Sequence, residues 1–230
     1  HQPMQIALKV IVKSGAIVGQ PATTPRRATP HIHLLKAWLA AYDLTGDRAH
    51  LARADAFVER FYDRFFDAET WSVTEFFDEQ WQPMPGQPGQ IFELGHHYEW
   101  TWLLKRHAAL STDRTTHDAV SRALFAFAEA FGRNHRTGMV YEAIDQDGRP
   151  LAETARCWPQ TEALEALLVL DRTGTPSLGA RIDETLSVLL DRMLSDCRRG
   201  CWMDQYDANG DLIARDIAAS TLYQLFVALS

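Results

Sequence analysis

Three times along this 230-residue chain, a helix-length amphipathic segment runs into an acidic, aromatic hairpin, and a polar cluster then opens the next helix. The hairpins span residues 65–83, 132–150 and 195–213, and the polar clusters span residues 95–100, 156–162 and 219–224. A unit that recurs about every 65 residues is typical of repeat architectures, in which each unit buries the apolar face of its neighbour. Because the clusters fall at the same phase of the repeat, we expect them at one end of a ring of helices, where an active site would lie.

The pattern of apolar residues predicts seven helices of two alternating kinds. Segments at about 33–42, 96–110, 159–170 and 218–229 are apolar nearly all round, which indicates inner helices. Segments at about 48–66, 117–131 and 178–194 are apolar on one face only, which indicates outer helices. Turn signals such as Asp147-Gly148 and Asn209-Gly210 mark the hairpin tips. These elements predict an all-α fold, an α/α toroid with short β-hairpins that seven helices close only in part.

Residues 1–29 do not follow the repeat. A short β-like apolar run is followed there by a stretch rich in Pro, Thr and Arg, which is typical of a linker. We therefore expect residues 1–29 to be an atypical amino-terminal segment, as a truncated or out-of-frame start would produce. Residues 30–230 are expected to form the partial barrel.

Composition narrows the choice of partners and compartment. The chain is 46% hydrophobic and carries a net charge of −7, and no basic stripe offsets this acidity, so nucleic acid is not an expected partner. No apolar run approaches the roughly 18 residues that a membrane span requires, so we predict no membrane span. The three cysteines, Cys157, Cys197 and Cys201, are an odd number in a chain with a large core. This favours a reducing compartment, and we predict a cytoplasmic protein.

His96 and Glu99 are the strongest candidates for proton transfer. They lie three residues apart and therefore share one face of a helix, whereas the side chain of His97 diverges from them. An imidazole titrates near neutral pH, and a neighbouring carboxylate can orient it or a sugar hydroxyl. The alternative is that Gly95 starts a helix that simply contains two hydrogen-bonded structural histidines.

The second polar cluster has the composition of a polyol-binding site. Arg156 supplies a cation, Gln160 an amide and Glu162 a carboxylate, and Trp158 offers an aromatic face to a sugar ring. Pro159 fits the first turn of the helix that begins there. The alternative is that Arg156 and Glu162 form a structural ion pair.

A metal site is not predicted. His31 and His33 open the first helix, but residues two apart on a helix do not converge on one ion. One of the two is expected to face the mouth of the ring. Glu75 could join Glu99 or Glu162 as a carboxylate pair for glycoside hydrolysis, an alternative that sequence spacing leaves open.

Five motifs together resemble one known family. They are HIHLLKA at residues 31–37, EFFD at 75–78, GHHYEW at 95–100, RCWPQTE at 156–162 and STLY at 220–223. Across residues 30–230 these motifs resemble the N-acylglucosamine 2-epimerase family, which includes mannose isomerases and cellobiose 2-epimerases. The resemblance implies an (α/α)6 barrel of twelve helices, of which the seven predicted here would match the carboxy-terminal portion.

The resemblance also implies a mechanism without a metal or redox cofactor. The ring-opened sugar loses its C2 proton to a histidine, and an enediol-like intermediate forms. Protonation at C1 then gives the ketose, and protonation on the opposite face of C2 gives the epimer. By motif, His96 resembles one acid/base and His33 a substrate-facing or ring-opening histidine. Four side chains resemble sugar-site residues: Glu75, Glu99, Arg156 and Trp158.

The chain departs from the family pattern on the last helix. Family members typically carry a second acid/base histidine after the Ser-Thr-x-Tyr motif, where this chain has Gln224. An amide does not exchange a proton in this pH range, so one of two proton carriers would be missing.

The leading hypothesis is a sugar isomerase or 2-epimerase domain that acts on an open-chain aldose through His96, with a small sugar as its partner and no cofactor. One alternative is a non-catalytic carbohydrate-binding remnant, and another is an α/α-toroid glycoside hydrolase. An open ring would expose inner-helix residues such as Trp38, Trp102 and Leu225, which predicts a homo-oligomer.

Overall fold

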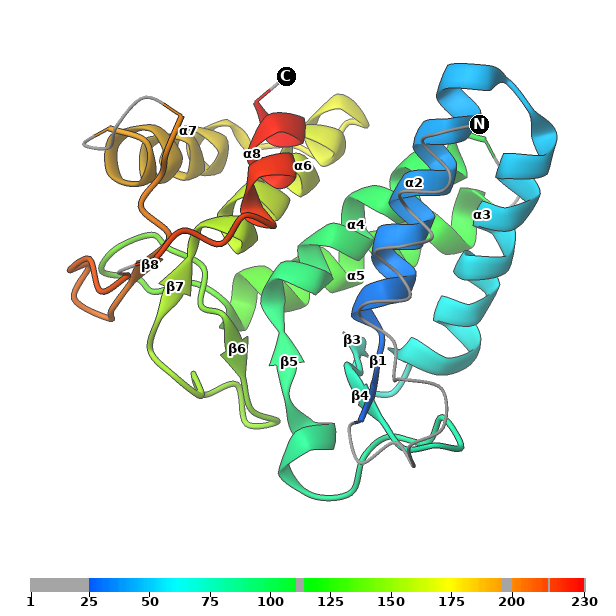
Figure 1. The fold of residues 1–230 in the computed structure, drawn as a ribbon, viewed down its shortest axis with the longest axis horizontal. Helices are drawn as coiled ribbons and strands as arrows, with labels where there is room; N and C mark the ends of the chain where they lie inside the picture. Colours follow the sequence, from blue (N-terminus) through cyan, green and yellow to red (C-terminus); the bar gives the residue numbers. More distant parts are fainter. Residues whose placement is uncertain (1–24, 111–113, 196–199, 215, 230) are drawn as a thin grey trace.

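The computed structural model describes residues 25–110, 114–195, 200–214 and 216–229 (Figure 1). Within these residues the chain forms seven α-helices, as the apolar pattern predicts. They are α2 (Thr29–Thr45), α3 (Arg48–Arg60), α4 (Leu94–Ala108), α5 (Arg114–Phe131), α6 (Cys157–Arg172), α7 (Gly179–Ser187) and α8 (Thr221–Ala228). The prediction for residues 1–24 lies outside the described residues.

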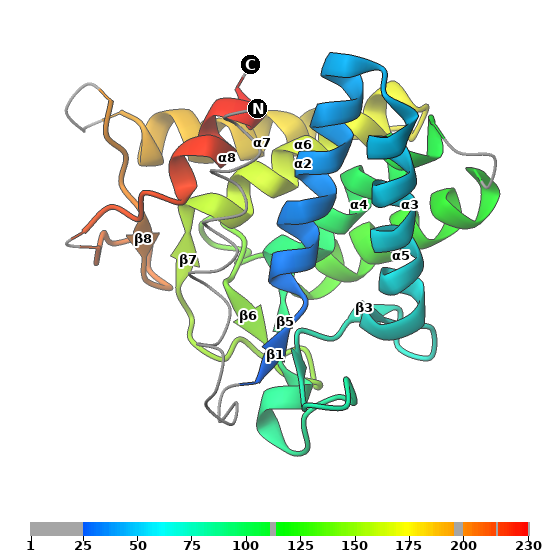
Figure 2. The same cartoon turned by 45° about the vertical axis from the view of Figure 1, so that its right-hand side comes forward.

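The helices alternate between an inner and an outer layer. The inner helix α4 packs against α2, α5 and α6, and α6 in turn packs against α7 and α8. Nearly every residue of α4 is buried, whereas α5 buries one face only. Figures 1 and 2 show α2 and α3 at one end of the arrangement and α7 and α8 at the other, with α4 and α6 between them. The expected partial toroid is therefore confirmed.

The ends of several helices differ from those expected. The helix predicted at about 33–42 runs from Thr29 to Thr45, because its polar first turn carries no apolar signal. It ends at Gly46, whose φ of 67° is left-handed and whose N–H donates to the Tyr42 carbonyl oxygen. The outer helices predicted at 48–66 and 178–194 end in π-helical turns, Phe61–Phe65 and Val188–Met193. Both turns carry buried apolar side chains: Phe61, Phe65, Val188, Leu189 and Met193.

The hairpins close at their tips as the turn signals predict, with local bridges such as Ile144–Pro150 and Tyr206–Leu212, and they also pair with strands outside the hairpin. The short strand that leads into each inner helix pairs, antiparallel, with a strand of the hairpin that follows that helix pair. Thus β1 (Arg26–Arg27) pairs with β4 (Phe76–Phe77), β5 (Phe92–Glu93) with β6 (Ala143–Ile144), and β7 (Ala155–Arg156) with β8 (Gln205–Tyr206). Only β2 (Phe66–Asp67) and β3 (Ser72–Val73) pair within one hairpin among the described strands. Each hairpin therefore fastens the start of an inner helix to the mouth.

The apolar core runs between the layers. Trp100 of α4 is fully buried and lies with its ring centroid 4.1 Å from that of Phe61. Of the three residues expected to be exposed, Trp102 and Leu225 are 5% and 6% exposed, so the expectation is wrong for these two, and Trp38 is partly buried. The inner helices cover them: the Trp102 indole N–H donates to Glu162 of α6, and Leu225 packs in a cluster with residues of α6.

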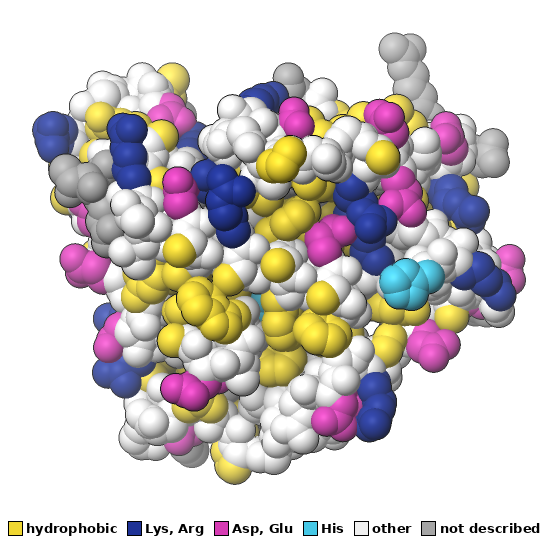
Figure 3. Space-filling model, turned by 180° about the vertical axis from the view of Figure 1, so that it is seen from behind, with side chains coloured by type: hydrophobic (Ala, Val, Ile, Leu, Met, Phe, Trp, Pro, Cys, Tyr) yellow, Lys and Arg dark blue, Asp and Glu magenta, His cyan; other side chains and the backbone are white. Residues whose placement is uncertain are grey.

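The surface mixes apolar and charged side chains. On the face seen in Figure 3, hydrophobic side chains gather near the centre and charged side chains lie mainly toward the edges. On α8, Leu222 is 58% and Phe226 is 73% exposed. None of the helices in the described segments is both long and apolar enough to cross a lipid bilayer.

Candidate functional site

The strands before the inner helices place three charged side chains at the mouth. Arg27, Glu93 and Arg156 are each the second residue of such a strand, so the repeat presents them in the same position. Sequence reasoning identified Arg156 and missed the other two. The signal was the repeat itself, because each charge lies within two residues of the start of an inner helix.

His96 lies in the first turn of α4 and is held by two carboxylates. Its Nδ1 atom is 3.1 Å from Glu75 Oε2 and 3.3 Å from Glu93 Oε2. The side chain is buried, and burial alone would lower its pKa. The negative charges of Glu75 and Glu93 outweigh burial and raise the pKa of His96 to about 9. Nδ1 of His96 therefore faces the two carboxylates.

Arg27 contacts both carboxylates, and Thr29 contacts Glu75, whereas burial raises the pKa of Glu93. Arg27 Nε donates to Glu75 Oε1 at 2.9 Å, a second Arg27 nitrogen binds Glu93, and the Thr29 hydroxyl also donates to Glu75. Burial raises the pKa of Glu75, but the positive charges of His96 and Arg27 lower it further, to about 2. Glu75, Glu93 and His96 are also the described side chains whose ligand atoms lie within 4.8 Å of one another, close enough to hold a metal ion. Arg27 occupies the other oxygens of both carboxylates.

A second charged group lies deeper, around Lys36 of α2. Its ammonium is 2.7 Å from Glu99 Oε1 and 2.9 Å from Glu162 Oε1. Glu162 accepts two further hydrogen bonds, from Trp102 Nε1 at 2.8 Å and from Gln224 Nε2 at 3.2 Å. In spite of burial, the two carboxylates raise the pKa of Lys36, so it stays charged. Sequence reasoning missed Lys36, although it lies one turn after His33 on the same face of α2.

Glu99 differs from Glu162 in what surrounds it. Apart from the close Lys36 ammonium, neither Glu99 oxygen accepts a well-aligned hydrogen bond from the described residues, and the side chain is fully buried. Burial raises the pKa of Glu99 more than Lys36 lowers it, and the charge of Glu162 raises it again, to about 7. Glu99 is thus a buried carboxyl group that can exchange a proton near neutral pH.

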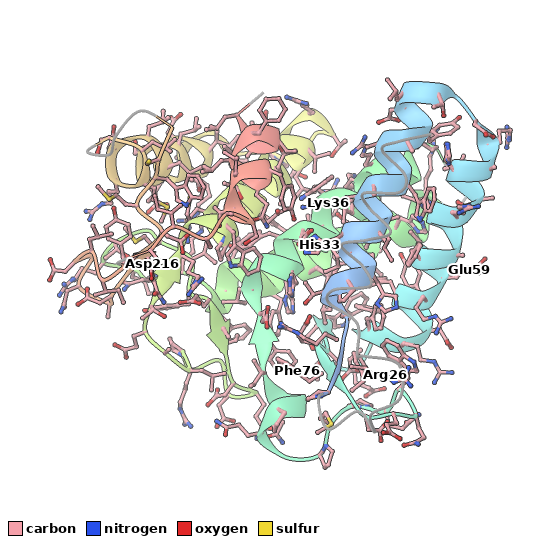
Figure 4. The ribbon with its side chains drawn as sticks, viewed as in Figure 1. Arg26, His33, Lys36, Glu59, Phe76 and Asp216 are labelled. Carbon is pink, nitrogen blue, oxygen red and sulfur yellow. The ribbon has the colours of Figure 1, made fainter. Side chains whose placement is uncertain are left out.

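His33 connects α2 to α8. Its Nδ1 atom lies 2.9 Å from the Tyr223 hydroxyl, and the ring is about half-exposed. Packing around the ring and the positive charge of Lys36 lower the pKa of His33. Figure 4 shows His33 and Lys36 on the side of α2 that faces α4 and α8, with Glu59 of α3 on the far side. His31 points elsewhere and packs against Phe65, with 4.9 Å between ring centroids.

Arg156 and Gln160 of the second polar cluster have different surroundings. Arg156 Nε lies 3.1 Å from Glu142, and Arg156 Nη1 lies 3.5 Å from Asp204. Arg156 therefore remains at the mouth and does not pair with Glu162, so the ion pair considered from the sequence does not form. The amide of Gln160 is buried and binds the backbone N–H and carbonyl of Val140, which ties the second hairpin to α6.

Trp158 forms a wall beside His96. The two ring centroids are 5.1 Å apart, and the indole also lies against Gly95. A methyl group at Gly95 would come within 2.1 Å of the indole. Glycine is therefore required here by the close approach of Trp158 and not by its backbone angles.

Gly95→Ala should consequently displace Trp158 from the His96 ring and lower the free energy of unfolding by about 1–3 kcal/mol, the usual cost of overpacking. Urea denaturation measures this loss. Gly179→Ala is the matched control, because a methyl group there meets no atom within 4 Å. Equal stability of the two variants would show that the contact between Gly95 and Trp158 is not tight.

Fold and site together define an α/α-toroid protein with acid–base groups at the mouth of its ring. The chain belongs to the N-acylglucosamine 2-epimerase (GlcNAc 2-epimerase) family, whose model matches residues 14–228. The match includes part of the segment at residues 1–29.

Individual relatives agree with this assignment. The chain is 36% identical over 219 residues to a mannose-6-phosphate isomerase from Rhizobium meliloti (strain 1021), covering 91% of this chain and 55% of the relative. A crystal structure of D-mannose isomerase matches with a TM-score of 0.75 at 18% identity, over 91% of this chain and 56% of that one. Cellobiose 2-epimerase from Bacillus thermoamylovorans matches with a TM-score of 0.74 at 18% identity, over 88% and 52% of the two chains. The chain thus spans about half the length of these relatives.

Proposed function

We propose that this chain carries the proton-transfer site of a sugar isomerase or 2-epimerase that acts on an open-chain aldose. The observation that supports this most is His96, whose Nδ1 lies 3.1 Å from Glu75 and 3.3 Å from Glu93, so that Nε2 is the nitrogen that would meet a substrate. A carboxylate on one imidazole nitrogen fixes the ring and makes the other nitrogen more basic. That is what removal of a weakly acidic proton next to a carbonyl requires.

The surrounding groups suit a neutral sugar. Trp158 offers an aromatic face beside His96, and Arg156 offers guanidinium N–H donors for hydroxyls. His33 faces the same space from α2 and suits a role in ring opening. The names of the relatives favour mannose as the first aldose to try. The buried thiol of Cys157 suits a reducing compartment such as the cytoplasm.

A glycoside hydrolase is less well supported. That reaction needs two carboxyl groups that flank the bond to be broken. Glu99 and Glu162 instead both contact the Lys36 ammonium, and Glu75 is occupied by Arg27 and His96.

The function is tested by deuterium exchange. The chain is incubated in heavy water with mannose, glucose or N-acetylmannosamine, and the C2 proton is followed by NMR. We expect the C2 signal of at least one aldose to decay in proportion to protein concentration. Unchanged C2 signals for all three sugars would overturn the proposal.

A further inference from the structure

We propose that the mouth of the ring contains an inhibitory binding site for a first-row transition dication such as Zn²⁺, formed by His96 Nδ1, Glu75 Oε2 and Glu93 Oε2. A cation bound there takes the nitrogen opposite the one that would meet a sugar, and so prevents His96 from acting as a base. The binding site stands on geometry and ligand chemistry, whereas its effect on proton transfer rests on the proposed function.

The three ligand atoms already have nearly the spacing of a coordination shell. His96 Nδ1 lies 3.1 Å from Glu75 Oε2 and 3.3 Å from Glu93 Oε2, and the ligand atoms of the three residues all lie within 4.8 Å of one another. With bonds of about 2.0–2.2 Å to Zn²⁺, neighbouring ligands of one ion lie roughly 3–3.5 Å apart. Two of the three edges of such a site therefore have a suitable length without any movement of the side chains.

The second oxygen of each carboxylate is held by other residues. Glu75 Oε1 accepts hydrogen bonds from Arg27 Nε and from the backbone N–H and hydroxyl of Thr29. Glu93 Oε1 accepts one from another nitrogen of Arg27. These donors leave both Oε2 atoms directed at His96. Hydrogen bonds of this kind orient the ligands of metal sites, and the two carboxylates outnumber the single guanidinium, so the cluster still attracts a cation.

Two of the three ligand atoms are buried without a satisfactory partner. Glu75 Oε2 and His96 Nδ1 touch each other, but neither makes a well-aligned hydrogen bond to any residue that the structure describes. The two residues are only 1% and 4% exposed. Buried polar atoms normally have a well-aligned partner, so these two atoms point to a ligand that both can bind. The Glu93 side chain is 19% exposed and gives such a ligand access from solvent.

The ligand set indicates which cation would bind. Mg²⁺ and Ca²⁺ prefer oxygen ligands alone, whereas one imidazole with two carboxylates suits Zn²⁺ and its neighbours in the first transition row. Three protein ligands leave a fourth position for a water molecule. We therefore expect Zn²⁺ to bind much more tightly than Mg²⁺ or Ca²⁺.

A cation on Nδ1 determines where His96 carries its proton. In a neutral imidazole one nitrogen bears the proton and the other accepts. Coordination uses the lone pair of Nδ1, so the remaining proton lies on Nε2, and an imidazolium ion releases its Nδ1 proton to solvent. In either case Nε2 is a donor without a lone pair, and it does not accept the C2 proton of a sugar. The cation thus blocks the base without entering the sugar position.

Co²⁺ is the probe for binding, because its visible absorption strengthens in a four-coordinate site and its binding is read without any substrate. At pH 8 we expect this absorption to saturate with Co²⁺, and Zn²⁺ but not Mg²⁺ to abolish it. Glu93→Gln should weaken Co²⁺ binding at least about 100-fold, since loss of an outer partner alone costs 10- to 100-fold. Glu142→Gln is the matched control, because Glu142 also contacts an arginine at the mouth but lies outside the cluster, and it should keep the original Kd.

Inhibition is tested on C2 exchange with mannose. Zn²⁺ at ten times its Kd should lower the exchange rate to about a tenth, in proportion to the sites left empty, and a chelator should restore it. The Glu142→Gln chain should be inhibited at the same Zn²⁺ concentration as the unaltered chain. Any exchange that the Glu93→Gln chain retains should resist that concentration.

The other outcomes separate the two parts of the inference. Equal Co²⁺ absorption in the unaltered chain and in folded Glu93→Gln and His96→Gln chains would place the ion elsewhere and overturn the site. Full Co²⁺ or Zn²⁺ loading with an unchanged rate of C2 exchange would overturn the inhibition. A chain that binds Co²⁺ as expected but exchanges C2 of no aldose would overturn the proposed function, and the effect on His96 with it, while the cation site stands.

Discussion

His96→Gln should lower the rate of deuterium incorporation at C2 of mannose by about 10²- to 10⁴-fold, the range over which a positioned acid–base group contributes to a rate. Glutamine retains a polar side chain that Glu75 and Glu93 can contact, so the local packing is largely kept. It has no group that binds and releases a proton near neutral pH. The loss should therefore appear in kcat more than in KM.

Two comparisons make this result specific to His96. His135→Gln is the matched control, because His135 is exposed in the second hairpin and its replacement should leave the exchange rate unchanged. Circular dichroism and urea denaturation show whether the His96→Gln chain is folded. A folded variant that exchanges C2 at the original rate would remove His96 from the proton-transfer step.

Lys36→Met should lower the free energy of unfolding by roughly 3–5 kcal/mol, because removal of one partner from a buried ion pair leaves an uncompensated charge. The two carboxylates that Lys36 holds are almost fully buried, with side-chain exposures of 0% for Glu99 and 3% for Glu162. Methionine fills a similar volume, so the loss reports charge more than packing. Urea denaturation at pH 8 measures it.

A second substitution separates charge from shape. Glu99→Gln in the Lys36→Met background should recover part of the lost stability, because it removes one of the two carboxylates left without a cation. Arg149→Met breaks an exposed ion pair with Asp147 and should change stability by no more than about 0.5 kcal/mol. A Lys36→Met chain as stable as the Arg149→Met chain would contradict a buried charge network.

The alternation of inner and outer helices could be predicted from sequence because the distribution of apolar residues along a helix reflects how many of its faces are buried. A helix such as α4 that is buried all round, beside a helix such as α5 that is buried on one face, implies two layers. The partners of the hairpin strands could not be predicted in the same way. Strands of two residues are too short to show a period, and β5 pairs with β6 some fifty residues away.

At the site, relationships set by local spacing could be predicted from the sequence, whereas contacts between distant segments could not. His96 and Glu99 were grouped correctly on one helix, since a spacing of three residues fixes their shared face. Whether Arg156 pairs with Glu162 depends on which residues of other segments lie next to each. In the structure Arg156 contacts Glu142, and Glu162 contacts Lys36. The roles of Arg27 and Glu93 likewise arise only when β1 and β5, which are distant in sequence, come together beside His96.

The strands that fasten each hairpin to an inner helix have a consequence for how such proteins diversify. Arg27, Glu93 and Arg156 occupy the same place in three successive units, and the backbone pairing that holds this place does not depend on the side chain. A change of charge at any of these positions alters the electric field at the mouth and leaves the helix core untouched. Substitutions at these three positions can therefore change the charge at the mouth during evolution while the fold is kept.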